Sequence, residues 1–88
     1  MKTEEAKVVN KLGIHARPAA QIVKTASVFD STIELTVDGS RVNAKSIMGV
    51  MTLAACRGSL ITVSAEGEDE DQAISAILKL IRDGFGEE

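Results

Sequence analysis

The chain has 88 residues, of which 44% are hydrophobic and 26% charged, and its formal net charge at pH 7 is −3. A chain of this size forms a single domain, residues 1–88, whose core is too small to enclose a buried active-site cavity. The negative charge, and two phenylalanines with no tryptophan or tyrosine, argue against nucleic-acid binding, which needs a basic track or a stacking platform.

The only cysteine, Cys56, cannot form an internal disulfide, and a zinc site would lack ligands. We expect it to be a small buried or half-buried thiol, and we expect neither a metal nor a cofactor. The N-terminus is charged where a signal peptide would be apolar, and no apolar run approaches the length of a membrane span. A cytoplasmic protein without membrane insertion is therefore predicted.

The first predicted elements are a strand and a helix. Residues 5–10 are short and contain β-branched side chains, which favours a strand. Residues 16–29 place apolar side chains at helical spacing, and Pro18 fits the first turn, where its missing N–H costs nothing. The predicted helix therefore begins directly after His15.

A hairpin is predicted next. Residues 32–37 alternate strictly, with Ile33 and Leu35 on one face. Asp38 and Gly39 follow, and both tolerate the positive φ of a two-residue turn. The return strand is predicted over residues 40–44.

The rest of the chain predicts a short helix, a strand and a long helix. Residues 46–55 form the short helix, with Ser46 placed to cap it. Residues 60–66 alternate as a strand. Residues 67–85 place acidic residues at the start of a helix and one apolar stripe along it, which is typical of a core-facing helix.

The predicted order is βαββαβα. Four strands with apolar residues on one face only need helices on that face alone. The predicted class is therefore α+β: an open-faced β-sandwich with a four-stranded antiparallel sheet and three helices on one face.

The segment GIHARPAA, residues 13–20, contains the only histidine. The first N–H groups of a helix lack internal partners and attract anions. The guanidinium of Arg17 adds paired N–H donors whose geometry suits phosphate oxygens. A partly neutral imidazole at His15 can act as a nucleophile toward a phosphoryl group. Since the chain has no nucleotide-binding loop, it could only relay phosphate between partners. The local pattern leaves a second interpretation open, in which His15 only caps the helix and Arg17 is solvated.

Two separated segments, GIHARPAAQIV and NAKSIMGVMTLA, together resemble the HPr family of phosphocarriers in the bacterial phosphoenolpyruvate-dependent phosphotransferase system. The resemblance spans essentially the whole chain, including the GFGEE tail. It implies that His15 receives phosphate on Nδ1 from enzyme I and passes it to the IIA domain of a sugar permease. It further implies that Arg17 lies beside this phosphate, and that Ser46 is the serine modified by an HPr kinase/phosphorylase.

The resemblance also implies that both partners dock around His15, on residues matching Ala16, Ala20, Ile47, Met48 and Met51. The short helix independently carries more apolar side chains than one helix can bury on one side, and exposed methionine suits several partners. The alternative is that its apolar residues all belong to the core. We expect a monomer.

Two features leave the partners open. Leu12 stands where many sugar-branch members have a small polar residue, and NKLGIHARP is closer to the nitrogen-branch relative, whereas KSIMGVM is closer to the kinase-regulated sugar-branch form. A regulatory-only binding module, in which phosphorylated Ser46 docks a transcriptional regulator, is the alternative of another class. A free-standing enzyme is disfavoured, because a substrate pocket and a second catalytic group are missing.

Overall fold

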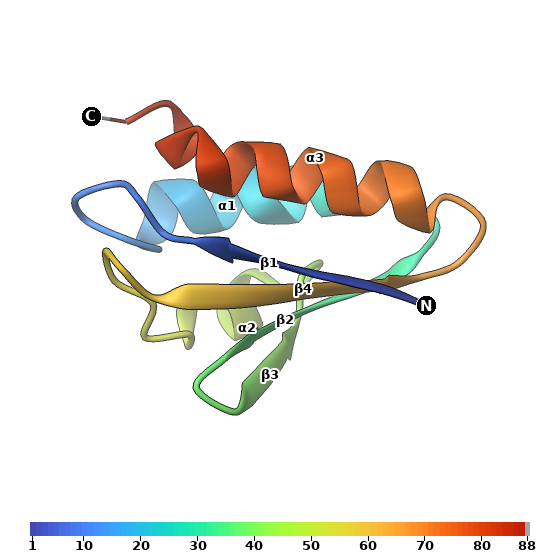
Figure 1. The fold of residues 1–88 in the computed structure, drawn as a ribbon, viewed down its shortest axis with the longest axis horizontal. Helices are drawn as coiled ribbons and strands as arrows, with labels where there is room; N and C mark the ends of the chain where they lie inside the picture. Colours follow the sequence, from blue (N-terminus) through green and yellow to red (C-terminus); the bar gives the residue numbers. More distant parts are fainter. Residues whose placement is uncertain (88) are drawn as a thin grey trace.

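A four-stranded antiparallel sheet covered by three helices makes up residues 1–87, the part of the chain that this computed structural model describes (Figure 1). The elements in chain order are β1 (Lys2–Lys7), α1 (Ala16–Ala26), β2 (Thr32–Val37), β3 (Ser40–Asn43), α2 (Ile47–Met51), β4 (Leu60–Glu66), α3 (Glu70–Arg82) and a 3₁₀ turn (Gly84–Gly86). The predicted fold class and the order βαββαβα are confirmed. Glu88, the last residue of the predicted domain and of the GFGEE tail, lies outside the described residues.

The strands lie in the order β1-β4-β2-β3, so the last strand in sequence pairs with both β1 and β2. Leu35 of β2 lies opposite Val63 of β4, and both are fully buried. Alternate residues of these two strands face the helices, as the alternation predicted. The β2–β3 hairpin turns at Asp38 and Gly39, both with positive φ, as the predicted two-residue turn requires.

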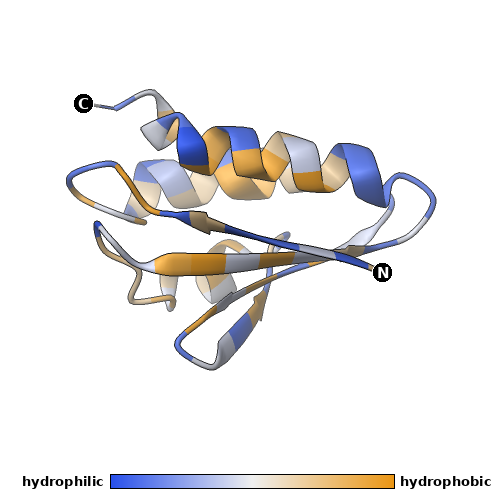
Figure 2. Cartoon of the chain, in the orientation of Figure 1, coloured by the Kyte–Doolittle hydropathy of each residue, from blue (hydrophilic) through white to orange (hydrophobic). Residues whose placement is uncertain are grey.

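Helices α1 and α3 run side by side across the sheet, and α2 packs against α1 and β3 (Figure 1). Their hydrophobic sides face inward (Figure 2). The predicted stripe of α3 is buried, comprising Ile74, Ile77, Leu78 and Ile81. Burial of this stripe against the sheet holds the layers together, because apolar area removed from water is the main stabilising contribution.

Several element boundaries differ from the predictions. Strand β1 spans Lys2–Lys7 rather than 5–10: it pairs with β4 from Lys2 opposite Ala65 to Lys7 opposite Leu60, and Val8 bonds to the loop before β4. Helix α2 ends at Met51 rather than at 55: the Leu53 amide donates to the Val50 carbonyl three residues back rather than to the one four residues back, and the Ala55 carbonyl accepts the amide of Ile14.

The ends of the other two helices are also shorter than predicted. Helix α1 ends at Ala26 rather than at 29, and the amide of Asp30 just beyond it donates to Asp69. Helix α3 begins at Glu70 and ends at Arg82, because Gly84, directly after the C-cap Asp83, takes a positive φ of 63° that ends the helix.

The prediction that Cys56 is buried or half-buried is wrong, because its side chain is exposed. Cys56 lies in the loop between α2 and β4, where the preceding Ala55 takes the inward position. The loop is held by Ser59, whose hydroxyl accepts the Cys56 amide at 3.1 Å.

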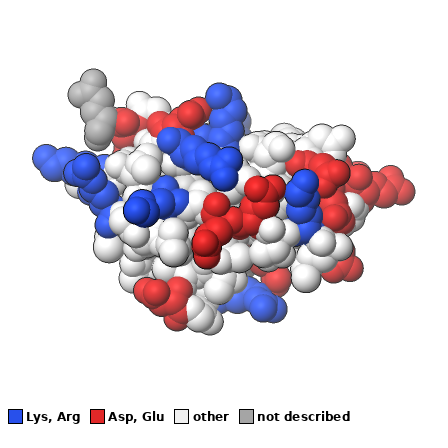
Figure 3. All heavy atoms as spheres, in the orientation of Figure 1, with Lys and Arg blue, Asp and Glu red and all other residues white. Residues whose placement is uncertain are grey.

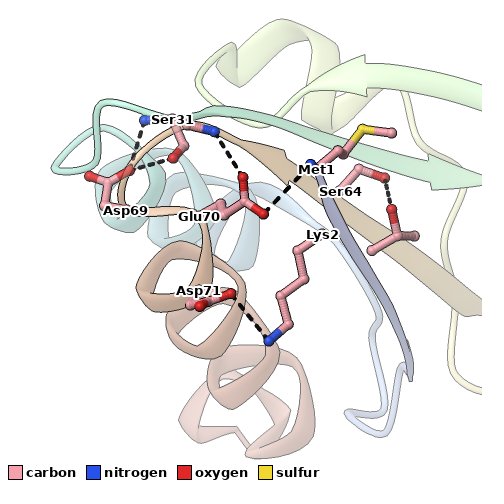
Figure 4. A network of polar contacts seen from close by, with 9 residues as sticks. Met1, Lys2, Ser31, Ser64, Asp69, Glu70 and Asp71 are labelled. Carbon is pink, nitrogen blue, oxygen red and sulfur yellow. Dashed lines mark hydrogen bonds and ion pairs between the residues drawn. The ribbon is translucent and has the colours of Figure 1, made fainter.

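The two ends of the molecule carry different polar clusters. At the end where β4 leads to α3, the Asp69 carboxylate accepts from Ser31, and the chain amino group of Met1 pairs with Glu70 (Figure 4). At the other end, the β1–α1 loop lies beside the C-terminal segment (Figure 1). This second end contains His15.

Candidate functional site

The β1–α1 loop places His15 at the start of α1. Gly13 has a φ of +68°, and a β-carbon there would lie 2.5 Å from the carbonyl oxygen of Ala55. Only glycine therefore fits this tight crossing of two backbones. His15 is the N-cap, and its carbonyl accepts the amide of Ala19 at 3.0 Å. Pro18 lies in the first turn, as predicted, and its side chain is buried.

The imidazole of His15 contacts the C-terminal segment. Its Nε2 lies 2.9 Å from Oε2 of Glu87, and its side chain is 36% exposed, against 14% for Glu87. Asn10 binds the same carboxylate through Nδ2, at 3.0 Å from Oε1. The hydrogen bond from Asn10, then that from His15 and the charges of His15 and Arg17, hold the pKa of the Glu87 carboxyl below its ordinary value against an opposing effect of burial. The carboxylate is thus charged beside the ring at neutral pH.

Arg17 lies in the first turn of α1 and is exposed. In Figure 3, basic side chains lie at the end of the molecule that carries the β1–α1 loop, and acidic side chains gather at the opposite end. The free N–H groups at the start of α1 and the Arg17 guanidinium favour anions near the partly exposed ring of His15, and the Glu87 carboxylate is the negative charge on the other side of that ring.

Ser46 caps α2, as predicted. Its Oγ accepts the Gly49 amide at 3.1 Å, and its backbone is extended. The side chain is half-buried, and the two residues that follow it, Ile47 and Met48, are exposed.

The five predicted docking residues lie on the two adjacent helices α1 and α2, and all five are exposed: Ala16, Ala20, Ile47, Met48 and Met51. We call these residues the α1–α2 patch. Val50 and Leu53, between and beyond them, are buried in the core. The alternative in which every apolar residue of the short helix is core is therefore wrong, since Met48 is 78% exposed. Leu12, at 70%, adds a further exposed apolar side chain on the loop before His15.

Two residues of the site, Asn10 and Glu87, were not predicted. The sequence pattern predicts a strand that includes Asn10, but Asn10 follows β1 and is buried in the loop between β1 and α1. Glu87 is separated from His15 by most of the chain, so local spacing gives no sign of it. A polar side chain that is buried needs a hydrogen-bond partner, and this rule is the one general indication that Asn10 belongs to a polar network.

Proteins of similar sequence belong to one family. The family model described as the PTS HPr component phosphorylation site matches residues 2–83. The phosphocarrier protein HPr of Treponema pallidum is 53% identical over 88 residues, which cover all of both chains.

Solved structures share the fold. The crystal structure of HPr-C-His from Thermoanaerobacter tengcongensis superposes with a TM-score of 0.95 at 51% identity, covering 100% of this chain and 99% of that one. The crystal structure of the HPr dimer from the same organism gives a TM-score of 0.79 at 50% identity, covering 99% and 100%.

The fold and the site define a small carrier domain whose histidine lies partly exposed at the surface. The chain belongs to the HPr family of phosphocarrier proteins of the phosphotransferase system. Among residues 1–87, no helix is both long and apolar enough to cross a membrane.

Proposed function

We propose that His15 accepts a phosphoryl group from enzyme I and passes it to the IIA domain of a sugar permease, in the cytoplasm and as a monomer. The observation that carries the proposal is the position of the ring. It is partly exposed, at the start of an 11-residue helix and two residues before Arg17. Such a helix start offers unpaired N–H donors to phosphate oxygens, and the arginine adds a fixed positive charge.

The α1–α2 patch supports the same proposal, because a relay also needs a surface on which its partner proteins dock. Its exposed methionines can adapt to more than one partner surface, which a relay between two proteins needs. Basic side chains at this end suit a partner with an acidic docking surface, because opposite charges speed association.

We further propose that phosphorylation of Ser46 by an HPr kinase/phosphorylase regulates this relay. Ser46 precedes the exposed Ile47 and Met48, so a phosphate would bring about two negative charges into the α1–α2 patch. The same modification could provide a docking site for a transcriptional regulator. In that role the chain would act as a binding module.

The experiment combines the purified chain with phosphoenolpyruvate and enzyme I and measures acid-labile phosphate. Wild type should be labelled, and His15→Ala should not, because no other imidazole is available. Label that persists in His15→Ala would overturn the assignment.

A second experiment decides which branch the carrier serves, since the segment around Leu12 resembles the nitrogen branch. Phosphorylated carrier is offered separately to IIA domains of the sugar-permease branch and of the nitrogen branch. The oligomeric state is measured by analytical ultracentrifugation, because the T. tengcongensis relative has also been crystallised as a dimer.

A further inference from the structure

The ring of His15 is held by a carboxylate that is itself held by the loop preceding the histidine. Glu87 accepts at Oε2 from Nε2 of His15 at 2.9 Å and at Oε1 from Nδ2 of Asn10 at 3.0 Å. We infer that Glu87 is a positioning residue for phosphoryl transfer, which fixes the proton of His15 on Nε2 and leaves the lone pair of Nδ1 free to attack. This inference rests on the proposed function of His15.

The assignment of the proton follows from the chemistry of the two groups. An ionised carboxylate can only accept hydrogen bonds, so the ring nitrogen that faces it must be the donor. A neutral imidazole has one ring N–H, and with that hydrogen on Nε2 the other nitrogen, Nδ1, carries the lone pair. The lowered pKa of Glu87 agrees with this reading, because it keeps the carboxyl ionised.

The transfer step then needs no proton movement at His15. The Nδ1 lone pair forms a bond to phosphorus, and the bond from phosphorus to the leaving group of the donor breaks, with its electron pair departing on that group. The phosphorylated ring, still protonated on Nε2, gains a positive charge that the Glu87 carboxylate offsets at hydrogen-bond distance. When the phosphoryl group leaves for the acceptor, the ring returns to its neutral form with the same N–H.

Asn10 keeps the carboxylate in place. It is 2% exposed, and its Nδ2 donates to both the Gly13 carbonyl at 2.8 Å and Glu87. The opposite orientation of the amide would direct its oxygen at two acceptors, so the network fixes it. The loop that carries the histidine and the segment that carries the carboxylate are therefore tied together by one side chain.

The segment before Glu87 is also anchored. Phe85 is buried, and its carbonyl accepts from Nε2 of Gln21 on α1 at 3.3 Å. Gly84 packs against the β1–α1 loop, since a β-carbon there would lie 3.5 Å from Val9. These contacts hold the C-terminal segment against α1 and the loop, so Glu87 is presented to the ring by folded structure.

The test compares Glu87→Ala and Glu87→Gln with wild type and with Glu68→Ala. Glu68 is an exposed acidic residue before α3, and the 13 residues of that helix separate it from Glu87 by about 20 Å. The first measurement is ¹⁵N NMR of the imidazole in the unphosphorylated protein, at a pH where the ring is neutral. The second is the rate of phosphorylation by enzyme I and phosphoenolpyruvate. Thermal unfolding of each variant shows that it is folded.

We expect wild type and Glu68→Ala to show one tautomer, protonated on Nε2, and equal rates. Glu87→Ala should show a mixture of tautomers and accept phosphate about 10-fold more slowly, the loss expected for one charge-assisted hydrogen bond. Glu87→Gln keeps an acceptor but brings an NH₂ group toward Asn10, so it should fall between the two. An unchanged ¹⁵N pattern and an unchanged rate in Glu87→Ala would overturn the inference. A wild-type chain that accepts no phosphate would instead overturn the proposed function, while the ¹⁵N pattern, measured without a partner, still reports the hydrogen bond to Glu87.

Discussion

Gly13 and Ala55 form a close backbone crossing directly beneath the histidine loop. A β-carbon on Gly13 would lie 2.5 Å from the Ala55 carbonyl oxygen, which also accepts the Ile14 amide at 3.1 Å. The crossing ties the start of α1 to the loop that follows α2, two segments far apart in the sequence. Through it, the position of His15 depends on the packing of both helices.

Gly13→Ala should therefore destabilise the protein by about 2–4 kcal/mol, because a methyl group at positive φ would also overlap backbone atoms that cannot move independently. The matched control is Gly39→Ala in the β2–β3 turn, where φ is also positive but nothing in residues 1–87 lies within 4 Å of the new carbon. The control should cost only about 1–2 kcal/mol, from the left-handed backbone alone. Chemical denaturation of both variants measures the difference, and equal losses would show that the crossing contributes nothing.

Arg17→Ala should slow phosphoryl transfer about 10-fold while leaving the stability nearly unchanged, because an exposed arginine contributes little to folding. The rate of transfer from enzyme I and the thermal midpoint are measured on the same preparation. Arg41→Ala, an exposed arginine on β3, is the control and should transfer at the wild-type rate. A normal rate in Arg17→Ala would mean that the helix N–H groups alone stabilise the phosphate.

Substitutions at Ser46 should change the stability and the rate of phosphoryl transfer independently of each other. Ser46→Ala should lose the cap on Gly49 and about 1 kcal/mol of stability. Ser46→Asp keeps a capping oxygen, so its thermal midpoint should not fall, yet its charge beside Ile47 and Met48 should lower the rate of His15 phosphorylation.

The control for the charge is Ser75→Asp, on the exposed side of α3. It should leave the transfer rate unchanged. If Ser46→Asp transfers normally, or slows only because it unfolds, Ser46 is a helix cap and not a switch.

At the opposite end of the molecule, Asp69 should contribute to stability in a pH-dependent way. Its carboxylate accepts from the hydroxyl and amide of Ser31 and from the amide of Asp30, and the Ser31 hydroxyl is the main reason that its pKa is lowered. A carboxyl whose pKa is lower in the folded state stabilises that state at pH values above its unfolded pKa, and the contribution is lost as the pH falls through the folded pKa.

The stability difference between wild type and Asp69→Asn should therefore be largest at neutral pH and shrink in acid. Denaturant unfolding over a series of pH values measures it. Asp71→Asn is the matched control, an exposed carboxylate on the same helix paired only at the surface with Lys2, and should give a smaller difference. A difference for Asp69→Asn that stays constant down to acid pH would contradict the assignment.

The elements with a clear period were predictable from the sequence, because side-chain alternation and helical spacing reflect burial on one face. Strands β2 and β4 follow the alternation, and the Asp38–Gly39 turn follows from the residues that tolerate positive φ. Strand β1 was placed several residues late. Its only core residue is Ala6, so its strongly polar sequence carries little pattern, and pairing with β4 sets its position.

Three residues of the candidate site could be named from the sequence: the one histidine, an arginine two residues later, and a serine that can cap the short helix. The apolar residues of the α1–α2 patch were predictable as well. The folded chain was needed to show that Val50 and Leu53 are buried while Met48 is exposed, that Cys56 is exposed, and that Glu87 reaches the ring. Periodicity and capping act over a few residues, whereas the contact between His15 and Glu87 exists because the fold brings the β1–α1 loop and the C-terminal segment after α3 together.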